Sequence, residues 1–266
     1  MLLTCHARLA MFVDMTTFAQ GALVLHRLDQ FRPPALGGVM QANKPVVGGR
    51  TSTGELSAGL FYWSHSRFLG DFEFGLHHHE GFEIATFILD GENSHYDTAT
   101  RKWVTLNAGD VQIIRSGSGI SHNERVAKGS RAFQIWFDSG YQAALALKPS
   151  YTDYPAARFT SRTFAGGTIT DLIGGVGPVA ARTEGLVVRR IAVDAGASAR
   201  VDVGADRFTL GYVINGAATV NDSTVGADDA FTLNGNPTLE ITAAGASDVF
   251  VVSVPSPPSY QPVRQR

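Results

Sequence analysis

The stretch TFILDGENSHYDTATRKWVTLNAGDVQII, residues 86–114, alternates short β-prone runs with turn residues. A second stretch, GYVINGAATVNDSTVGADDAFTL at residues 211–233, repeats the same order of runs and turns. Asp-Gly at 90–91 and Asn-Gly at 215–216 are dipeptides that favour two-residue hairpin turns. The similarity predicts a duplicated β module with a linker at about 145–165.

Short apolar runs that end at glycine, asparagine or aspartate continue along most of the chain. This spacing is typical of antiparallel sandwiches and barrels, and not of alternating strands and helices. One short helix is expected within 140–147, before Pro149. The sequence therefore predicts an all-β protein.

Composition limits the classes of function. The chain has 266 residues, of which 44% are hydrophobic and 17% charged, with a formal net charge of -2. These values predict a compact globular protein with one large or two ordinary domains. No lysine/arginine block is present, so neither direct nucleic-acid binding nor capture by an anionic membrane is expected. Cys5 is the only cysteine, which favours a reducing, cytoplasmic location.

The histidines are confined to the first module, since all eight lie at or before residue 122. Three of them are consecutive in GLHHHEGFE, residues 75–83. Because side chains alternate along a strand, His77 and His79 are expected on one face and His78 on the other. Two same-face imidazoles can reach one ion, although a histidine run alone is more often a solvent-exposed loop.

A second same-face pair strengthens the metal interpretation. In GSGISHNER, residues 117–125, the glycines permit a tight turn before His122 and Glu124. Three histidines and one carboxylate from two strands form a divalent metal site that is open on one side. Such a ligand set accepts Fe(II), Mn, Ni, Cu or Zn, so the sequence predicts a metal centre without naming the metal.

Residues 70–155 resemble the pirin family of two-domain cupins. The family pattern contains H-P-H-R-G-F-E, H-x-D, P-G-D-x-Q-W-M and G-x-G-I-x-H-x-E, and this chain has HHHEGFE, HYD, AGDVQII and GSGISHNE. The resemblance implies two tandem cupin barrels of the double-stranded β-helix, or jelly-roll, type. It also places the family's Fe(II) ligands on His77, His79, His122 and Glu124.

The resemblance implies a function as well. Several pirins act as quercetin 2,3-dioxygenases, so a phenolic or enolisable small molecule and dioxygen are the expected substrates, with Glu124 as the catalytic base. The alternatives are a non-catalytic, iron-dependent cofactor that binds proteins and regulates transcription, and a cupin isomerase or lyase that uses Zn or Mn. His78, Glu80, Ile113-Ile114 and Ser118 depart from the family pattern, which weakens the assignment of a flavonol substrate.

Glu83 is an alternative carboxylate ligand. Glu83 lies an even number of residues from His77 and His79, so it would share their face in a continuous strand. H-x-H-x3-E is also the spacing of the general cupin motif. The resemblance favours Glu124 instead. Glu83 would then accept a hydrogen bond from one of the imidazoles, or be a buried carboxylate that accepts hydrogen bonds from the backbone.

Other candidates are expected to be structural. His95 and Asp97 fall on the H-x-D pair but are expected at the surface or in local hydrogen bonds. Trp103 and Trp136 are expected to pack inside the barrels, and Asp110 to fix a turn.

The sequence divides the chain into four predicted parts. Residues 1–20 are interpreted as a leader or a misplaced start, with Met15 as the more plausible first residue. A metal-binding N-terminal cupin domain is expected over 21–150, and a degenerate, metal-free C-terminal cupin domain over 151–255. A flexible tail is expected over 256–266.

Overall fold

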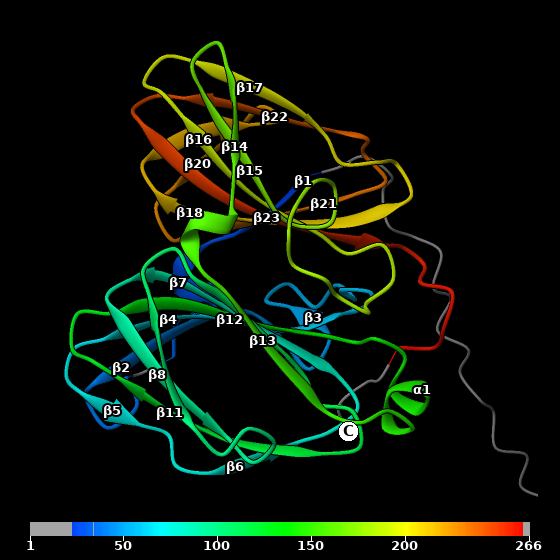
Figure 1. The fold of residues 1–266 in the computed structure, drawn as a ribbon. Coiled ribbons are helices and arrows are strands. Elements are labelled where there is room, and N and C mark those ends of the chain that lie inside the picture. Colours follow the sequence, from blue (N-terminus) through cyan, green and yellow to red (C-terminus); the bar gives the residue numbers. More distant parts are fainter. Residues whose placement is uncertain (1–22, 34, 263–266) are drawn as a thin grey trace, which may run out of the picture.

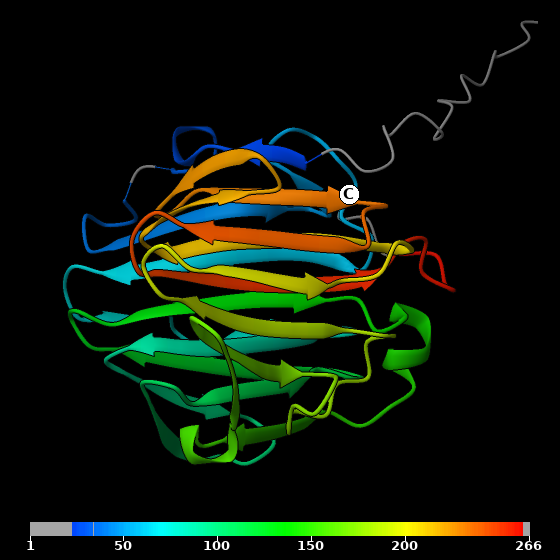
Figure 2. The same cartoon turned by 90° about the horizontal axis from the view of Figure 1, so that it is seen from above.

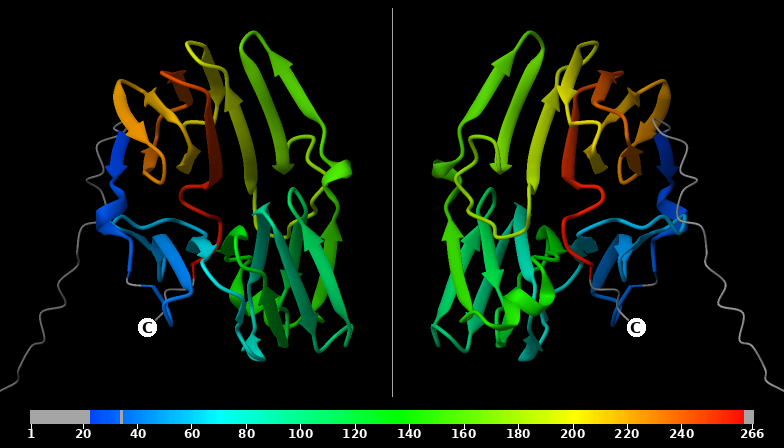
Figure 3. Two further views of the ribbon diagram at one scale, coloured as in Figure 1. Left: turned by 90° about the vertical axis from the view of Figure 1, so that its left-hand side faces the viewer. Right: turned by 90° about the vertical axis from the view of Figure 1, so that its right-hand side faces the viewer.

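A computed structural model describes residues 23–33 and 35–262 of the chain. The leader predicted at 1–20, including Met15, lies outside these residues. Two halves built from antiparallel strands lie one above the other (Figure 1), and Figure 3 shows the same two layers from either side. The expected helix is present as α1 (Tyr141–Leu145), and two 3-10 turns occur at Leu28–Gln30 and Ala156–Arg158.

The first half contains twelve strands in two sheets. Their bounds are Met40–Val47 (β2), Arg50–Thr51 (β3), Leu60–Phe68 (β4), Phe72–Glu73 (β5), His77–His79 (β6), Glu83–Asp90 (β7), Glu92–Asp97 (β8), Trp103–Asn107 (β9), Val111–Arg115 (β10), Ile120–Val126 (β11), Arg131–Phe137 (β12) and Ser150–Tyr154 (β13). The larger sheet has the order β13-β10-β7-β12-β4-β2-β3. The smaller sheet has the order β5-β11-β8-β9, and β6 also pairs with β11.

The second half is built in the same way. Its strands are Leu23–His26 (β1), Ser161–Phe164 (β14), Gly167–Ile173 (β15), Val187–Val193 (β16), Ser198–Asp202 (β17), Arg207–Asn215 (β18), Ala217–Val220 (β19), Ser223–Gly226 (β20), Ala230–Asn234 (β21), Thr238–Ala243 (β22) and Ser247–Pro255 (β23). The larger sheet has the order β1-β21-β18-β23-β16-β15-β14, and the smaller β17-β22-β19-β20. The predicted all-β fold with two jelly-roll units is confirmed, as pairs of open sheets rather than closed barrels.

The duplication is visible in the strand pairing. Strand β7 pairs with β10 in the larger sheet, while β8 and β9 between them form a hairpin in the smaller sheet. Strands β18 and β21 and the hairpin β19–β20 repeat this arrangement. Each half therefore places one continuous segment alternately in its two sheets.

The prediction of hairpin turns at 90–91 and 215–216 is wrong. The strands that flank each dipeptide lie in different sheets, so both dipeptides are corners where the chain leaves the larger sheet for the smaller. Gly91 and Gly216 still have positive φ values, 73° and 85°. The hairpin turn between β19 and β20 is Asn221-Asp222, whose φ values are 41° and 68°.

Both ends of the described chain are tied to the sheets. Strand β1 pairs with β21 of the second half, although it lies in the range predicted for the first domain, and Figure 2 shows it beside the strands of that half. Strand β13 pairs with β10 of the first half. Ser259 and Tyr260, in the predicted tail, donate hydrogen bonds to Glu184 and to the carbonyl of Asp138. The division of the chain into domains stays a prediction.

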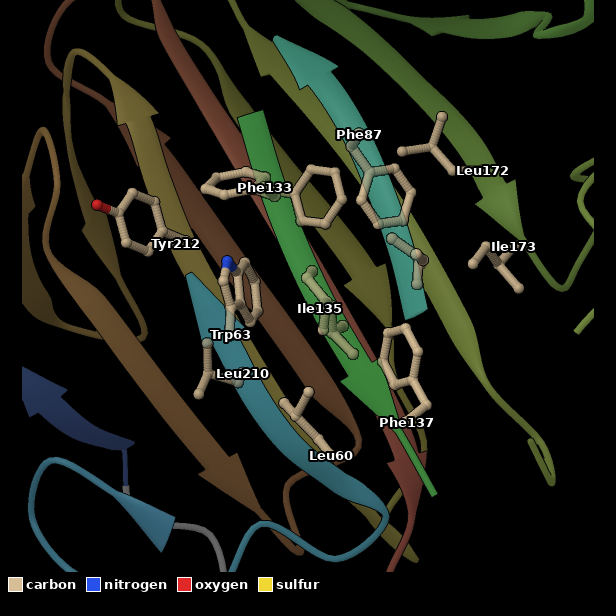
Figure 4. Packing of buried hydrophobic residues seen from close by; sticks show 14 of the residues in the cluster. Leu60, Trp63, Phe87, Phe133, Ile135, Phe137, Leu172, Ile173, Leu210 and Tyr212 are labelled. Carbon is tan, nitrogen blue, oxygen red and sulfur yellow. The ribbon is translucent and has the colours of Figure 1, made fainter. Parts of the chain in front are cut away.

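The largest apolar core lies between the two halves. Side chains from the inward face of one larger sheet, including Trp63, Phe133 and Ile135, pack against Leu210 and Tyr212 of the other (Figure 4). Several contacts in this core join aromatic rings. The Phe133 ring lies 5.3 Å from Trp63, 5.2 Å from Tyr212 and 4.8 Å from Phe250, measured between centroids.

The interiors of the two halves differ in polarity. The second interior is filled mainly by aliphatic side chains and Phe231, and its buried Thr209 and Ser253 hydroxyls are paired with each other. At Gly211 a Cβ atom would lie 2.0 Å from the Phe231 ring, so glycine is required there for the ring to fit. The first interior contains buried polar side chains instead: Ser64, Ser66, Thr86, Asn93, His95, Asp97, Gln112, His122 and Glu124. Chemistry that needs polar groups is therefore expected inside the first half.

Replacing Phe133 by alanine tests the role of the central core. We expect Phe133→Ala to lower the free energy of unfolding by about 3–5 kcal/mol, because a fully buried ring leaves a cavity. Since both halves share this core, urea denaturation should give one transition for the wild type and for the variant. Phe133→Leu is the matched control and should cost less. Two separated transitions in the wild type would contradict a shared core.

His26 provides a test of pH dependence. It is fully buried between the halves, where its ring nitrogens contact the hydroxyls of Ser52 at 2.8 Å and Thr232 at 3.2 Å. Burial lowers the pKa of His26 to about 4. The pKa of His26 is therefore lower in the folded protein than in the unfolded chain. As a result, His26 does not reduce the stability of the fold above about pH 6.5, and it reduces that stability increasingly as the pH falls towards 4.

We therefore expect His26→Gln to reduce the loss of stability between pH 7 and pH 4.5. Urea denaturation at both pH values measures this difference. The exposed His78 serves as the control, and His78→Gln should leave the difference unchanged. Equal pH dependence in the wild type and His26→Gln would show that the prediction is wrong.

Candidate metal centre

Three histidine side chains converge inside the first half. His77 on β6 lies directly opposite His122 on β11, and His79 follows two residues later on the same face. One nitrogen from each ring lies within 4.8 Å of the others. The ring centroids of His77 and His122 are 4.3 Å apart, and His79 lies 4.9 Å from each. This three-histidine group could bind a metal ion.

His78 lies on the opposite face, as strand alternation predicts. Its side chain is 57% exposed and its Nε2 atom lies 3.6 Å from Glu80. Its Nδ1 atom contacts the Ser121 hydroxyl at 3.3 Å. The middle histidine is therefore turned away from the cluster.

The unpaired nitrogens of the cluster fit a cation. Nε2 of His79 and both ring nitrogens of His122 are buried without a hydrogen-bond partner among the described residues. Burial, together with the neighbouring His77, lowers the pKa of His79 to about 4 and that of His122 to about 2. Both imidazoles are therefore neutral at pH 7 and have lone pairs free for a metal.

Glu124 lies on the same face of β11 as His122. It is buried, and its Oε1 atom accepts a hydrogen bond of 2.9 Å from Nε2 of Gln134. Burial raises the pKa of Glu124 to about 7. The carboxylate is not part of the cluster defined by the 4.8 Å separation. Coordination of a metal by Glu124, as by the three histidines, stays a prediction.

Glu83 has a structural environment that differs from that of the cluster. Its carboxylate accepts hydrogen bonds from the backbone N–H groups of Arg182 and Thr183 and from the Thr183 hydroxyl. These residues lie in the loop before β16, so Glu83 joins the two halves. The parity with the histidines is lost because Gly81, at φ 78°, breaks the strand between β6 and β7.

Sequence reasoning missed the position of His95 and Asp97. They were expected at the surface or in local hydrogen bonds. Asp97 does accept local hydrogen bonds, from the backbone of Ala99 and Thr100, but both residues are almost completely buried. Strand β8 pairs with β11 so that His95 lies opposite Glu124 and Asp97 opposite His122. The His95 ring lies 5.3 Å from His122 and stacks on Tyr151 at 4.7 Å. The H-x-D spacing was the available signal, because residues two positions apart in a strand lie on the same face.

Aromatic side chains line one side of the cluster. Phe82 and Trp136 stack with centroids 5.2 Å apart, and the His79 ring lies 5.4 Å from Phe82 and 5.0 Å from Trp136. The Trp136 indole donates to Oε1 of Gln134 at 3.1 Å, so one amide joins this wall to Glu124. Trp103 does not pack inside the half, contrary to expectation, because it is 40% exposed beneath the guanidinium of Arg125.

Two further sequence expectations concern Asp110 and Glu80. Asp110 fixes a turn as predicted, since its carboxylate accepts hydrogen bonds from the backbone of Asn107 and Ala156. Glu80, which replaces the arginine of the family pattern, accepts a hydrogen bond of 2.9 Å from the Tyr141 hydroxyl of α1. The acidic side chain that stands in place of the arginine therefore lies at the protein surface beside β6.

Two jelly-roll halves with a histidine cluster inside one of them define a bicupin. Residues 54–137 match the sequence profile of the family described as Pirin. The family resemblance seen in the motifs is thereby confirmed for this segment of the chain.

Known proteins share parts of this sequence and most of the fold. A pirin-like protein of Caulobacter vibrioides is 28% identical over 160 residues, which are 57% of each chain. The quercetin 2,3-dioxygenase of Escherichia coli is 36% identical over 66 residues, 24% of this chain and 28% of that protein. The E. coli bacterial pirin YhhW, solved in complex with nickel(II), is 20% identical with a TM-score of 0.71. That alignment covers 91% of this chain and all of YhhW.

The sequence matches to both curated relatives span less than two thirds of their lengths. The likeness to the nickel-bound pirin supports the fold alone at this identity. Among residues 23–33 and 35–262 no helix has the length and apolar character needed to cross a membrane.

Metal content tests the cluster directly. We expect the wild type to bind one equivalent of Co(II), and the double variant His77→Ala/His79→Ala to lose it because two of three imidazoles are removed. His78→Ala is a matched control from the same strand and should keep full occupancy. Elemental analysis after gel filtration gives the stoichiometry. One equivalent of metal retained by the double variant would exclude this centre.

Proposed function

We propose that the protein is a pirin-like, metal-dependent dioxygenase that acts on a phenolic or enolisable small molecule. The observation that carries the proposal is the group of three imidazoles, two of them buried, next to a buried carboxylate whose pKa is raised. The name of the E. coli relative, quercetin 2,3-dioxygenase, supports the reaction class. A cytoplasmic location, expected from the single cysteine, is part of the proposal.

Fe(II) is the proposed metal, held by His77, His79, His122 and Glu124. When bound, it would supply Lewis acidity towards the substrate oxygen and electrons towards dioxygen. The neutral imidazoles contribute no charge, so one carboxylate leaves the centre with net positive charge to stabilise a substrate oxyanion. Nickel or another first-row ion fits the same ligand set, and the YhhW complex is an example of nickel in a related fold.

The protein side chains supply binding and proton transfer. Phe82 and Trp136 offer an apolar wall for an aromatic ring beside His79. Glu124 would accept the proton of the substrate hydroxyl on its carboxylate. In the protein without metal, burial raises the pKa of Glu124 to about 7, and a general base works best when its pKa lies near the working pH. Glu124 would therefore act as the base after leaving the metal.

Oxygen uptake tests the proposal. Fe(II)-loaded protein should consume dioxygen with at least one member of a panel of flavonols and enediols, quercetin included. We expect Glu124→Gln to lower kcat by about 10²–10⁴-fold because the base is lost. His122→Ala, which removes a proposed ligand, sets the background rate.

The same experiment separates the alternative functions. Iron binding without oxygen uptake above the His122→Ala background, for every substrate, would overturn the dioxygenase and favour an iron-dependent regulatory cofactor. Turnover under anaerobic conditions with Zn or Mn would instead indicate an isomerase or lyase.

A further inference from the structure

A small cavity lies next to Glu124 in the interior of the first half. Its volume is about 40 Å³. Most of the residues around it are buried, and its polar wall is formed by Ser64, Ser66, Thr86, Asn93, Glu124 and Gln134.

Strand register explains why these polar groups meet. Gln134 on β12 lies directly opposite Ser64 on β4 and Thr86 on β7, so the three side chains point from one face of the larger sheet. Asn93 and Glu124 come from β8 and β11 of the smaller sheet. The two sheets of the first half therefore enclose a polar volume from both sides.

Two of the polar atoms around the cavity are unpaired in the part of the chain that the structure describes. Thr86 Oγ1 and Asn93 Oδ1 are buried and have no hydrogen-bond partner among the described residues. Thr86 is 2% exposed and Asn93 is 5% exposed. An unpaired polar atom at this depth is costly, so native proteins bond such atoms to protein groups or to ordered water.

We propose that this cavity binds ordered water that hydrogen-bonds Thr86 and Asn93 and reaches the carboxylate of Glu124. A cavity needs about 10–15 Å³ by this measure to hold one water molecule, and the water needs two to four polar partners. Both conditions are met. This water site is an addition to the proposed function, and it rests on that function only for the role of Glu124.

The second half fills the corresponding volume with an apolar ring. Strand register makes Gly211 and Val251 the counterparts of Thr86 and Gln134, since they occupy the corresponding pairs of β18 and β23. The Phe231 ring packs against Gly211. Apolar packing thus replaces the polar wall where no buried carboxylate has to be solvated.

The water would also add to the hydrogen bonding of Glu124. Gln134 already donates to one oxygen of this carboxylate. Because Glu124 lines the cavity, water there would give it a further donor.

Thermal unfolding of Thr86→Val in the metal-free protein tests the proposal by the sign of the change in Tm. If water bonds the hydroxyl, its loss breaks that bond and Tm falls. If the hydroxyl is unpaired in a dry cavity, an isosteric methyl group removes a buried unsatisfied atom and Tm rises. A rise in Tm would overturn the proposal.

Thr209→Val provides the matched control. Thr209 is equally buried in the second half, and its hydroxyl contacts that of Ser253 at 2.9 Å. The Tm of Thr209→Val should fall whether or not the cavity holds water, and the size of the fall calibrates the loss of one buried hydrogen bond.

A crystal structure of the wild type is an independent test. Water density within hydrogen-bond distance of Thr86 Oγ1 and Asn93 Oδ1 supports the site, and a dry cavity overturns it.

The outcome is separable from that of the proposed function. Failure of the wild type to bind Co(II), or to consume dioxygen with Fe(II), would overturn the dioxygenase. The sign of the Tm change is measured without metal and decides on the water site alone.

Discussion

The packing of the two larger sheets against each other is the contact on which the rest of the structure depends. Burial of apolar surface is the main favourable term in folding, and here the largest share lies between the halves rather than inside either one. Trp63, Phe133 and Tyr212 pack in this shared core. The first half thus gains much of its stability from outside its own interior, which leaves that interior free to be polar.

A polar interior is tolerated only where its groups are paired. Part of the first interior follows this rule through side-chain bonds, such as that from Gln134 to Glu124. Among the described residues, the unpaired atoms of this interior lie on His79, His95 and His122 and on Thr86 and Asn93 of the cavity. These are the places where we propose a metal ion and ordered water.

The sequence predicts the elements of the site better than their surroundings. Strand alternation places His77 and His79 together and His78 outside, because that periodicity is a local property of the backbone. The same reasoning fails for Glu83, since a left-handed glycine interrupts the strand before it. It also misjudged His95, whose burial depends on pairing with β11 and not on its own neighbours in sequence.

By itself, the sequence determined the all-β class, the duplication and the facing of each histidine within its strand, because turn residues and alternation act over a few positions. Only the tertiary structure decided that His77 lies opposite His122, that Glu83 bonds to the second half, and that the Asp-Gly and Asn-Gly corners join different sheets. Those features depend on which strands pair and on their register. Pairing between distant strands is fixed by burial over the whole molecule, which no short segment specifies.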